Sequence, residues 1–356
     1  MKNIDWKNKL ILAPLTKGGN LPFRRLCEHF GADITVSEMA YAYKLFQGDR
    51  KEKALLRRTS KSGVFGVQLA AENLGVAIDA CQMAIDEGAD FIDLNCGCPI
   101  NDTVKRKMGS HLLQKPKRLA KLVEGMVRHS SIPITVKIRS GWDEKNINAI
   151  EVSKELESAG ASAITLHGRT RSQRYSKKAD WDLIARIVQE VDIPIIGNGD
   201  ILTFYEAEQR KEKSLCASLM IGRGALIKPW IFKEIKEKKS WDLSAQEKIE
   251  VYSQFAESMK DYFGHDDYGI KRATPLLAWH FSFLSKYHPL SKEEFEMQSK
   301  EHPLLQTRLD YPEEWHKDPL NKILSSPNEQ HHWKLAEIFL NSKSPTKIEA
   351  CIFQLN

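Results

Sequence analysis

The segment Asn-Cys-Gly-Cys-Pro at residues 95–99 places two thiols at the end of an apolar run. A buried strand needs no thiol at its end, whereas a metal site, a redox pair or a proton donor does. Cys96 and Cys98 lack a second Cys or His pair at zinc-binding spacing, so we expect no metal here. An ordinary thiol is mostly protonated at neutral pH, which suits a general acid.

Two cationic or titratable side chains interrupt other apolar runs. Lys137 lies within residues 134–140, and His167 lies within residues 163–169. A buried lysine is costly unless it is paired, which favours a functional role over a packing role. Lys137 can stabilise negative charge on a bound ring, or it can form a Schiff base with a carbonyl substrate.

Glycine-rich segments follow the last two apolar runs. They read GNGD at residues 197–200 and GRGA at residues 222–225. Glycine permits close approach of the backbone to a ligand, and Arg223 can pair with a phosphate. Two such segments in successive positions indicate a phosphorylated ligand.

Eight short apolar segments alternate with helical patterns over the first 240 residues. This alternation predicts a parallel sheet that helices cover on both faces. Eight units predict a (β/α)₈ TIM barrel, although counting units leaves an open, doubly wound sheet as an alternative. The expected strands are residues 10–16, 33–39, 64–70, 91–97, 134–140, 163–169, 193–199 and 217–223.

In such a barrel the chemistry gathers where the carboxyl ends of the strands open into one mouth. Every expected strand supplies a polar residue at or just beyond this end. These residues are Thr16, Glu38, Gln68, Asn95 with Cys98, Lys137 with Arg139, His167 with Arg169, Asn198 with Asp200, and Arg223.

The strand pattern stops near Trp241. Helical patterns follow at residues 242–264, 271–288 and 327–342, the first opened by Ser244 and Glu247 at capping-box spacing. We therefore expect a catalytic barrel over residues 1–240 and a smaller helical domain over residues 241–356.

The composition is that of a soluble globular protein, with 42% hydrophobic and 28% charged residues. Scattered cysteines and the lack of a signal-peptide or membrane-spanning pattern predict a cytoplasmic protein. Residues 1–240 hold 40 Lys and Arg against 29 Asp and Glu, whereas residues 241–356 hold 13 against 18. The excess positive charge on the larger part predicts a polyanionic partner.

Seven motifs in order resemble the flavin-dependent tRNA-dihydrouridine synthases. They are LAPLTKGGNLPFRRLCEHFGADITVSEMA, GVQLA, DLNCGCP, VKIRSGW, LHGRTRSQRYSKKADWDLI, IIGNGDI and MIGRGALIKPWIF. The resemblance covers roughly residues 10–285. The first and fifth motifs are most similar to the third eukaryotic branch, which acts at position 47 of the tRNA variable loop.

The resemblance implies FMN as cofactor, NADPH as electron donor and tRNA as partner. It implies that hydride passes from flavin N5 to C6 of an extruded uracil while Cys98 protonates C5. Residues that would hold the FMN are Pro14, Leu15, Thr16, Gln68, Lys137, His167, Asn198, Gly199, Asp200, Gly222 and Arg223. Asn95 would bind the uracil, and further substrate contacts are expected from Arg139, Arg169, Lys105, Arg106, Lys107, Lys271 and Arg272.

The sequence departs from the family at one place. The family usually has a glycine run after the catalytic loop, where this chain has Lys107, Met108 and Gly109. The replacement leaves loop motion and substrate choice open.

Other interpretations of the sequence stay open. They are the same chemistry at another tRNA uridine such as one in the D-loop, a flavin enzyme of a free pyrimidine, an RNA-binding protein without catalysis, and a Schiff-base aldolase that uses Lys137. The sequence does not specify an oligomeric state, and we expect a monomer.

Overall fold

A computed structural model of the chain describes residues 4–58, 63–287, 289, 291–299, 318–342 and 344–355. The chain forms two compact units, residues 1–222 and residues 223–356. The functional division at residue 240 stays a prediction.

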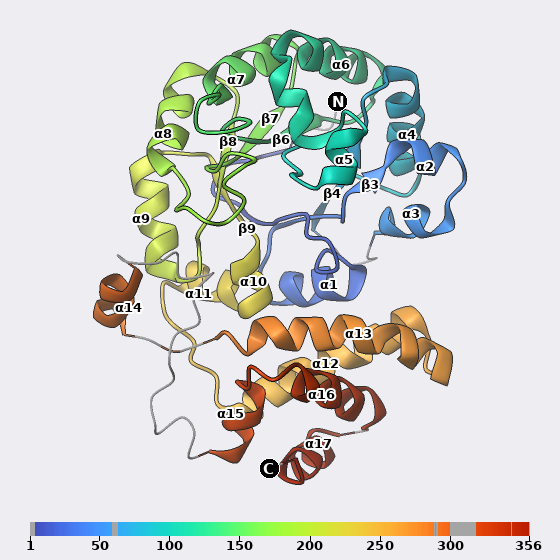
Figure 1. The fold of residues 1–356 in the computed structure, drawn as a ribbon, viewed down its shortest axis with the longest axis vertical. Coiled ribbons are helices and arrows are strands. Elements are labelled where there is room, and N and C mark those ends of the chain that lie inside the picture. The colour runs from blue at the N-terminus through green and yellow to red at the C-terminus, as the bar shows by residue number, and fades with distance from the viewer. Residues whose placement is uncertain are drawn as a thin grey trace. The chain divides into compact units, whose positions relative to one another are not determined.

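The first unit is a closed barrel of parallel strands (Figure 1). Within the described residues, β1 pairs with both β2 and β9, and β2 pairs with β4, so that the sheet closes on itself and the open-sheet alternative is excluded. The strands of the barrel are β1 (Leu10–Leu12), β2 (Ile34–Val36), β4 (Val64–Ala70), β5 (Phe91–Cys96), β6 (Ile134–Arg139), β7 (Ala163–His167), β8 (Ile195–Asn198) and β9 (Ser218–Ile221).

A ninth strand, β3 (Ala40–Tyr41), also pairs with β4. It contacts Leu69 and Ala70 at the carboxyl end of β4, whereas β2 pairs with the start of β4. The sequence did not predict it, because two residues carry no measurable periodicity. Two short helices follow it, α2 (Ala42–Phe46) and α3 (Arg50–Leu55).

Longer helices surround the barrel, as Figure 1 shows for α4, α6, α7, α8 and α9. They cover the outer faces of strands whose inner faces also lie in the core, which is why the strands read as continuous apolar runs. The helices are α1 (Leu21–His29), α4 (Leu74–Asp86), α6 (Pro116–His129), α7 (Ala149–Ser158), α8 (Trp181–Glu190) and α9 (Phe204–Ser214). The β5–α6 connection contains a short helix, α5 (Asn101–Lys105), and a 3₁₀ turn, η1 (Gly109–Gln114).

In its described residues the second unit is helical. The predicted capping box at Ser244 and Glu247 is confirmed at the start of α12. Phe281 on α13 stacks on Tyr252 of α12, with ring centroids 5.1 Å apart, and it also contacts Phe339 of α16. The helices are α10 (Arg223–Ile227), α11 (Ile231–Glu237), α12 (Ala245–Phe263), α13 (Asp267–Leu284), α14 (Lys292–Ser299), α15 (Pro319–Leu324), α16 (Glu329–Asn341) and α17 (Pro345–Phe353).

Among the described residues, no helix has both the length and the apolar character needed to span a bilayer.

Candidate active site

Strand register aligns the polar side chains on the inner surface of the barrel. Gln68 pairs with Asp93, and two residues further along β5 Asn95 pairs with Lys137. Residues side by side in a parallel ladder, and residues two apart along one strand, point to the same face. These side chains therefore form one interior surface toward the carboxyl ends of β4, β5 and β6.

A hydrogen-bond chain joins three of these side chains. Nε2 of Gln68 donates to Oδ2 of Asp93 at 2.7 Å, and Oε1 of Gln68 accepts from Nδ2 of Asn95 at 2.8 Å. Thr135 Oγ1 donates to the other oxygen of Asp93 at 2.8 Å. Burial raises the pKa of Asp93, and the bonds from Gln68 and Thr135 oppose that rise. The orientation of Asn95 is fixed by this chain.

Asn95 in turn holds the loop that carries Cys98. Its Oδ1 accepts the backbone N–H of Cys98 at 2.9 Å and that of Gly97 at 3.3 Å. The carbonyl oxygen of Cys98 accepts bonds from both the backbone and the hydroxyl of Ser110, at 3.1 and 2.9 Å. The half-buried thiol of Cys98 thus lies just past the end of β5, in a loop held on both sides.

Cys96 points the other way. It pairs with Ile138 in the ladder, one residue away from Asn95 and Lys137, and it is fully buried. Alternation along the strand places its thiol on the outer, helix-covered face of β5. Burial raises the pKa of Cys96 well above its usual value, so the thiol stays protonated and inert.

Residues 107–109, where this chain has Lys, Met and Gly in place of the glycine run expected from the family resemblance, have an unusual backbone conformation. Lys107 has φ of 60°, the left-handed conformation that glycine adopts most readily. Its N–H bonds to Val104 and that of Met108 bonds to Thr103, which is the Schellman pattern at the end of α5. Gly109, with φ of 61°, lies so close to Cys98 that an added Cβ would be 2.9 Å from the Cys98 oxygen.

Lys137 extends into the mouth from β6. Its Nζ donates to Oδ1 of Asn198 at 3.1 Å, and Asn198 is held by a bond from Nδ2 to the Met220 carbonyl at 2.7 Å. Burial, with the nearby Arg139 as a second cause, lowers the pKa of Lys137 to about 8, while Asp93 acts in the opposite direction.

Arg139 and Arg169, expected from the sequence to contact the substrate, are both buried and bonded within the protein. Arg139 donates to the carbonyl oxygens of Gly97 and Thr170, at 2.8 and 3.0 Å. It therefore ties the loop after β5 to the loop after β7.

Arg169 makes an ion pair with Asp200 in which its Nη2 donates to both carboxylate oxygens, each at 2.7 Å. Its Nη1 also lies 3.2 Å from Nε2 of His167. Asp200 has φ of 51° and Gly199 has φ of 129°, so the GNGD segment turns sharply after β8. These contacts position the loops after β7 and β8.

The remaining predicted residues lie at several places. Pro14 and Leu15 are half-buried and Thr16 is exposed, directly after β1. Gly222 follows β9, and Arg223 is the first residue of α10. The cations Lys105, Arg106 and Lys107 are exposed around the end of α5, and Lys271 and Arg272 are exposed on α13.

The model of the family described as dihydrouridine synthase matches residues 11–315. The chain belongs to the dihydrouridine synthase family. The chain is 40% identical to a tRNA-dihydrouridine(47) synthase [NAD(P)(+)] from Coprinopsis cinerea, over 95% of this chain and 51% of that protein. It is also 40% identical to the human protein named tRNA-dihydrouridine(47) synthase [NAD(P)(+)]-like, over 81% of this chain and 45% of that protein. The chain spans about half the length of the curated relatives it matches.

Solved structures share the fold of this dihydrouridine synthase family member. A histamine dehydrogenase from Rhizobium sp. 4-9 has a TM-score of 0.51 at 15% identity, covering 65% of this chain and 46% of that one. A 2-naphthoyl-CoA reductase has a TM-score of 0.52 at 16% identity, covering 65% and 50%. At these identities the likeness supports the barrel fold alone.

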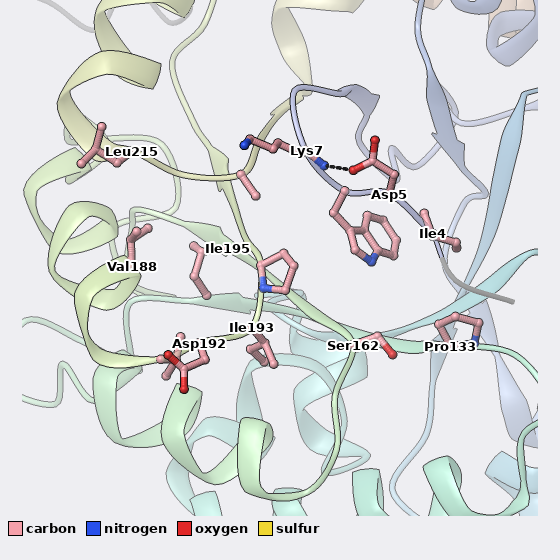
Figure 2. A pocket seen from close by; sticks show the side chains of 14 residues that line it. Ile4, Asp5, Lys7, Pro133, Ser162, Val188, Asp192, Ile193, Ile195 and Leu215 are labelled. Carbon is pink, nitrogen blue, oxygen red and sulfur yellow. Dashed lines mark hydrogen bonds between the residues drawn. The ribbon is translucent and has the colours of Figure 1, made fainter. Parts of the chain in front are cut away.

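A broad cavity of about 990 Å³ lies at the opposite end of the barrel. Its lining includes Pro133 before β6 and Ile193 before β8, both labelled in Figure 2. Ala217, which directly precedes β9, also lines it. Asp5, one of its charged residues, accepts a bond from the backbone of Lys7. The amino-terminal end of such barrels usually serves stability, which favours the carboxyl end as the candidate active site.

Sequence reasoning missed three residues of this site. Asp93 could have been found from the sequence, because it is an acid inside an apolar strand. It lies two positions before Asn95, so its side chain must point to the same face as that of Asn95. Tyr41 and Thr103 had no such signal. Their hydroxyls lie 2.8 Å apart, and Thr103 lies 3.6 Å from the Cys98 sulfur.

Proposed function

We propose that the chain is an FMN-dependent tRNA-dihydrouridine synthase that acts in the cytoplasm as a monomer. Its reaction is reduction of the C5–C6 double bond of a tRNA uridine, with NADPH as the source of electrons. The names of its relatives point to position 47. The observation that carries the proposal is the chain from Asp93 through Gln68 and Asn95 to the backbone of Cys98.

The donor set in the mouth fits FMN. Lys137 supplies a cation, Gln68 a fixed amide and His167 an aromatic ring at the ends of three strands of one barrel. Pro14 and Leu15 are half-buried and Thr16 is exposed after β1, and Gly199 and Gly222 offer positions without side chains after β8 and β9. When bound, FMN supplies the hydride that C6 of the uracil receives. Lys137 would stabilise negative charge at its ring, and Asn198, Asp200 and Arg223 would complete the contacts to its phosphate arm.

Cys98 would give its proton to C5 of the uracil. Asn95 fixes the loop of Cys98 through Oδ1, and an N–H of its amide remains for a uracil carbonyl after the bond to Gln68 is counted. The S–H bond breaks, the proton forms the new C5–H bond, and the electron pair stays on sulfur. The two rigid contacts to the Cys98 backbone hold the donor in place without a contribution from substrate.

The tRNA would contact the exposed cations beside the mouth. Lys105, Arg106 and Lys107 lie at the end of α5, seven to nine residues beyond Cys98. Exposed cations bind phosphate at little desolvation cost, and such binding weakens with salt. Arg139 and Arg169 would act on the reaction as positioning residues, because their guanidinium groups are bonded to protein atoms.

One observation favours a second candidate. A lysine with pKa near 8 in a mouth is suited to Schiff-base formation, as in an aldolase. Borohydride in the presence of carbonyl substrates would then trap an adduct at Lys137. A yellow purified protein that yields no adduct contradicts this candidate.

The experiment that tests the proposal maps dihydrouridine in tRNA from cells that lack the protein. Cells with the wild-type copy should regain the modification, and cells with a Cys98→Ala copy should not. The purified Cys98→Ala protein should keep its flavin, because no FMN contact is assigned to the thiol. Free uridine and uracil serve as comparison substrates, and turnover of these instead of tRNA would identify a free-pyrimidine enzyme.

A further inference from the structure

A pair of hydroxyl groups lies directly behind the Cys98 sulfur. Oγ1 of Thr103 is 3.6 Å from the sulfur, and the phenolic oxygen of Tyr41 is 2.8 Å from Oγ1. Thr103 comes from α5 and Tyr41 from β3, two short elements separated by about sixty residues of chain. The three groups thus form a continuous line from the sulfur to a half-buried phenol.

Packing alone does not require this arrangement. Thr103 has no exposed surface. A buried hydroxyl costs free energy unless it is hydrogen-bonded, and valine would fill the same volume without that cost. The Thr103 hydroxyl lies between the Cys98 sulfur and the Tyr41 phenol oxygen and can act as donor or acceptor toward either, which valine cannot.

The surrounding backbone fixes the distance between Thr103 and Cys98. Ser110 holds the Cys98 carbonyl with two bonds, and the Thr103 carbonyl accepts the N–H of Met108 at the end of α5. An added Cβ on Gly109 would come within 2.9 Å of the Thr103 methyl and 3.2 Å of the Cys98 Cβ. The hydroxyl therefore cannot move far from the sulfur.

We propose that Thr103 and Tyr41 form a hydroxyl chain that stabilises negative charge on the Cys98 sulfur as the thiol gives up its proton. The proposal rests on the proposed function, in which Cys98 is the acid. In the resting site the S–H donates to Thr103. When the S–H bond breaks and its proton passes to C5, the Thr103 O–H turns toward the sulfur and the Tyr41 O–H turns toward Thr103.

No O–H bond breaks in this step. The electron pair of the S–H bond remains on sulfur until water returns a proton after the product leaves. A hydrogen bond to a charged group is stronger than one to a neutral group, so the chain stabilises the state after proton donation more than the state before it. Thr103 and Tyr41 are accordingly positioning residues that act through Cys98.

Tyr41 is suited to remain a neutral donor. Burial raises its pKa, and the bond with Thr103 opposes the rise. The charged groups around it are Glu52, which accepts its backbone N–H, Lys44, whose Nζ is 5.1 Å from its ring centroid, and Asp102 on α5.

The first test measures thiolate formation without tRNA. Iodoacetamide attacks thiolates, so the rate of Cys98 alkylation at pH 8, followed by peptide mass spectrometry, reports the thiolate fraction. Thr103→Val should slow the reaction about five-fold and Tyr41→Phe about two-fold, whereas Thr103→Ser, which keeps the hydroxyl, should react like wild type. Cys351, half-buried in the second unit, is the internal reference and should not change.

The second test follows one turnover. Protein reduced without oxygen is mixed with tRNA transcript, and the return of flavin absorbance gives the rate. Thr103→Val should be about ten-fold slower at saturating tRNA, with unchanged flavin content and unchanged tRNA affinity, and Thr103→Ser should restore the rate.

Each outcome bears on the hydroxyl chain separately from the proposed function. Wild-type alkylation rates in both Thr103→Val and Tyr41→Phe overturn the chain, as does a Thr103→Ser protein as slow as Thr103→Val. If alkylation is slower but the single-turnover rate is unchanged, the hydroxyl chain has no role in proton donation. If reduced wild type does not react with tRNA, the proposed function fails, while alkylation still tests the chain. Tyr41→Phe supplies the result if Thr103→Val does not fold.

Discussion

Asn95 accepts the backbone N–H of Cys98 through its side-chain oxygen at 2.9 Å, and this bond fixes the start of the loop that carries the thiol. The Gln68 side chain holds the other end of the Asn95 amide at 2.8 Å. The thiol is thus positioned by an interior chain of side chains that begins at Asp93, well inside the barrel.

Replacing Asn95 with Ala should therefore misplace the thiol without removing it. We expect single-turnover oxidation of the reduced protein by tRNA to slow about 100-fold, the effect of a displacement on the order of 1 Å. Flavin content should stay unchanged. Asn328→Ala is the matched control, because Asn328 also accepts a backbone N–H through its side chain, at the start of α16. An Asn95→Ala protein as fast as this control would show that the bond has no catalytic importance.

Lys137 predicts a pH-dependent affinity for FMN. Its pKa of about 8 means that the side chain loses its charge as the pH rises through 8. An anionic ligand favours the charged form, so the complex holds the proton more tightly than the free protein does. The dissociation constant should then rise about ten-fold between pH 7 and pH 9, measured by quenching of FMN fluorescence. Lys137→Met should bind weakly with a flat profile, and a sloping profile in this variant would assign the effect to another group.

The Arg169–Asp200 pair should contribute strongly to stability. Arg169 is fully buried, and truncating it removes the ion pair from the largely buried Asp200 carboxylate, which keeps the backbone N–H bond from Ala179. Arg169→Ala should lower the free energy of unfolding by about 3–5 kcal/mol, measured by urea denaturation. Arg186→Ala, on the exposed face of α8, is the control and should stay within about 0.5 kcal/mol of wild type. Equal losses in the two variants would contradict a structural role for the pair.

Lys107 should be a site where glycine stabilises the protein. The φ of 60° at Lys107 costs a residue with a side chain about 1 kcal/mol, and glycine removes that cost. Glycine also raises the entropy of the unfolded chain, which offsets part of the gain in stability. We expect Lys107→Gly to raise the denaturation midpoint. Lys105→Gly, within α5, should lower it, since glycine destabilises a helix by about 0.5–1 kcal/mol. A lower midpoint in both variants would mean that the Lys107 side chain makes a stabilising contact.

The inner polar surface was largely predictable from the sequence. Gln68 and Lys137 each interrupt a run whose side chains alternate between two faces, and neighbouring strands of a closed parallel barrel bring such residues together. Strand β4 has the bounds that its apolar run predicted. Strand β1 ends at Leu12, earlier than predicted, because Pro14 supplies no N–H for a ladder.

The partners of the buried arginines were not predictable in the same way. A cation at a strand end can face a ligand or a carbonyl, and the choice depends on loops such as the one that brings Asp200 to Arg169 across thirty-one positions. Tyr41 and Thr103 were missed for a related reason. Both lie in elements of five residues or fewer, where hydrophobic periodicity carries no information.

The cations at the end of α5 should account for part of the salt dependence of tRNA binding. Lys105, Arg106 and Lys107 are exposed near the mouth, and each phosphate that a cation no longer neutralises should reduce the slope of log affinity against log salt by about 0.7–0.9. Replacing all three with Gln should therefore flatten the slope by about two units, measured by filter binding over a range of KCl concentrations.

The matched control removes the same charge from the other end of the barrel. Lys7, Arg128 and Lys213 are exposed and lie shortly before β1, β6 and β9 in the chain, at the amino-terminal ends of those strands. Their replacement with Gln changes net charge by the same amount, so it isolates position from charge. Salt at 0.1 M screens interactions between exposed charges that are more than about 10 Å apart, so cations at the other end of the barrel should not affect tRNA bound at the mouth. The control should therefore keep the wild-type slope. Equal slopes in the two triple variants would show that the cations act through net charge and do not contact tRNA at the mouth.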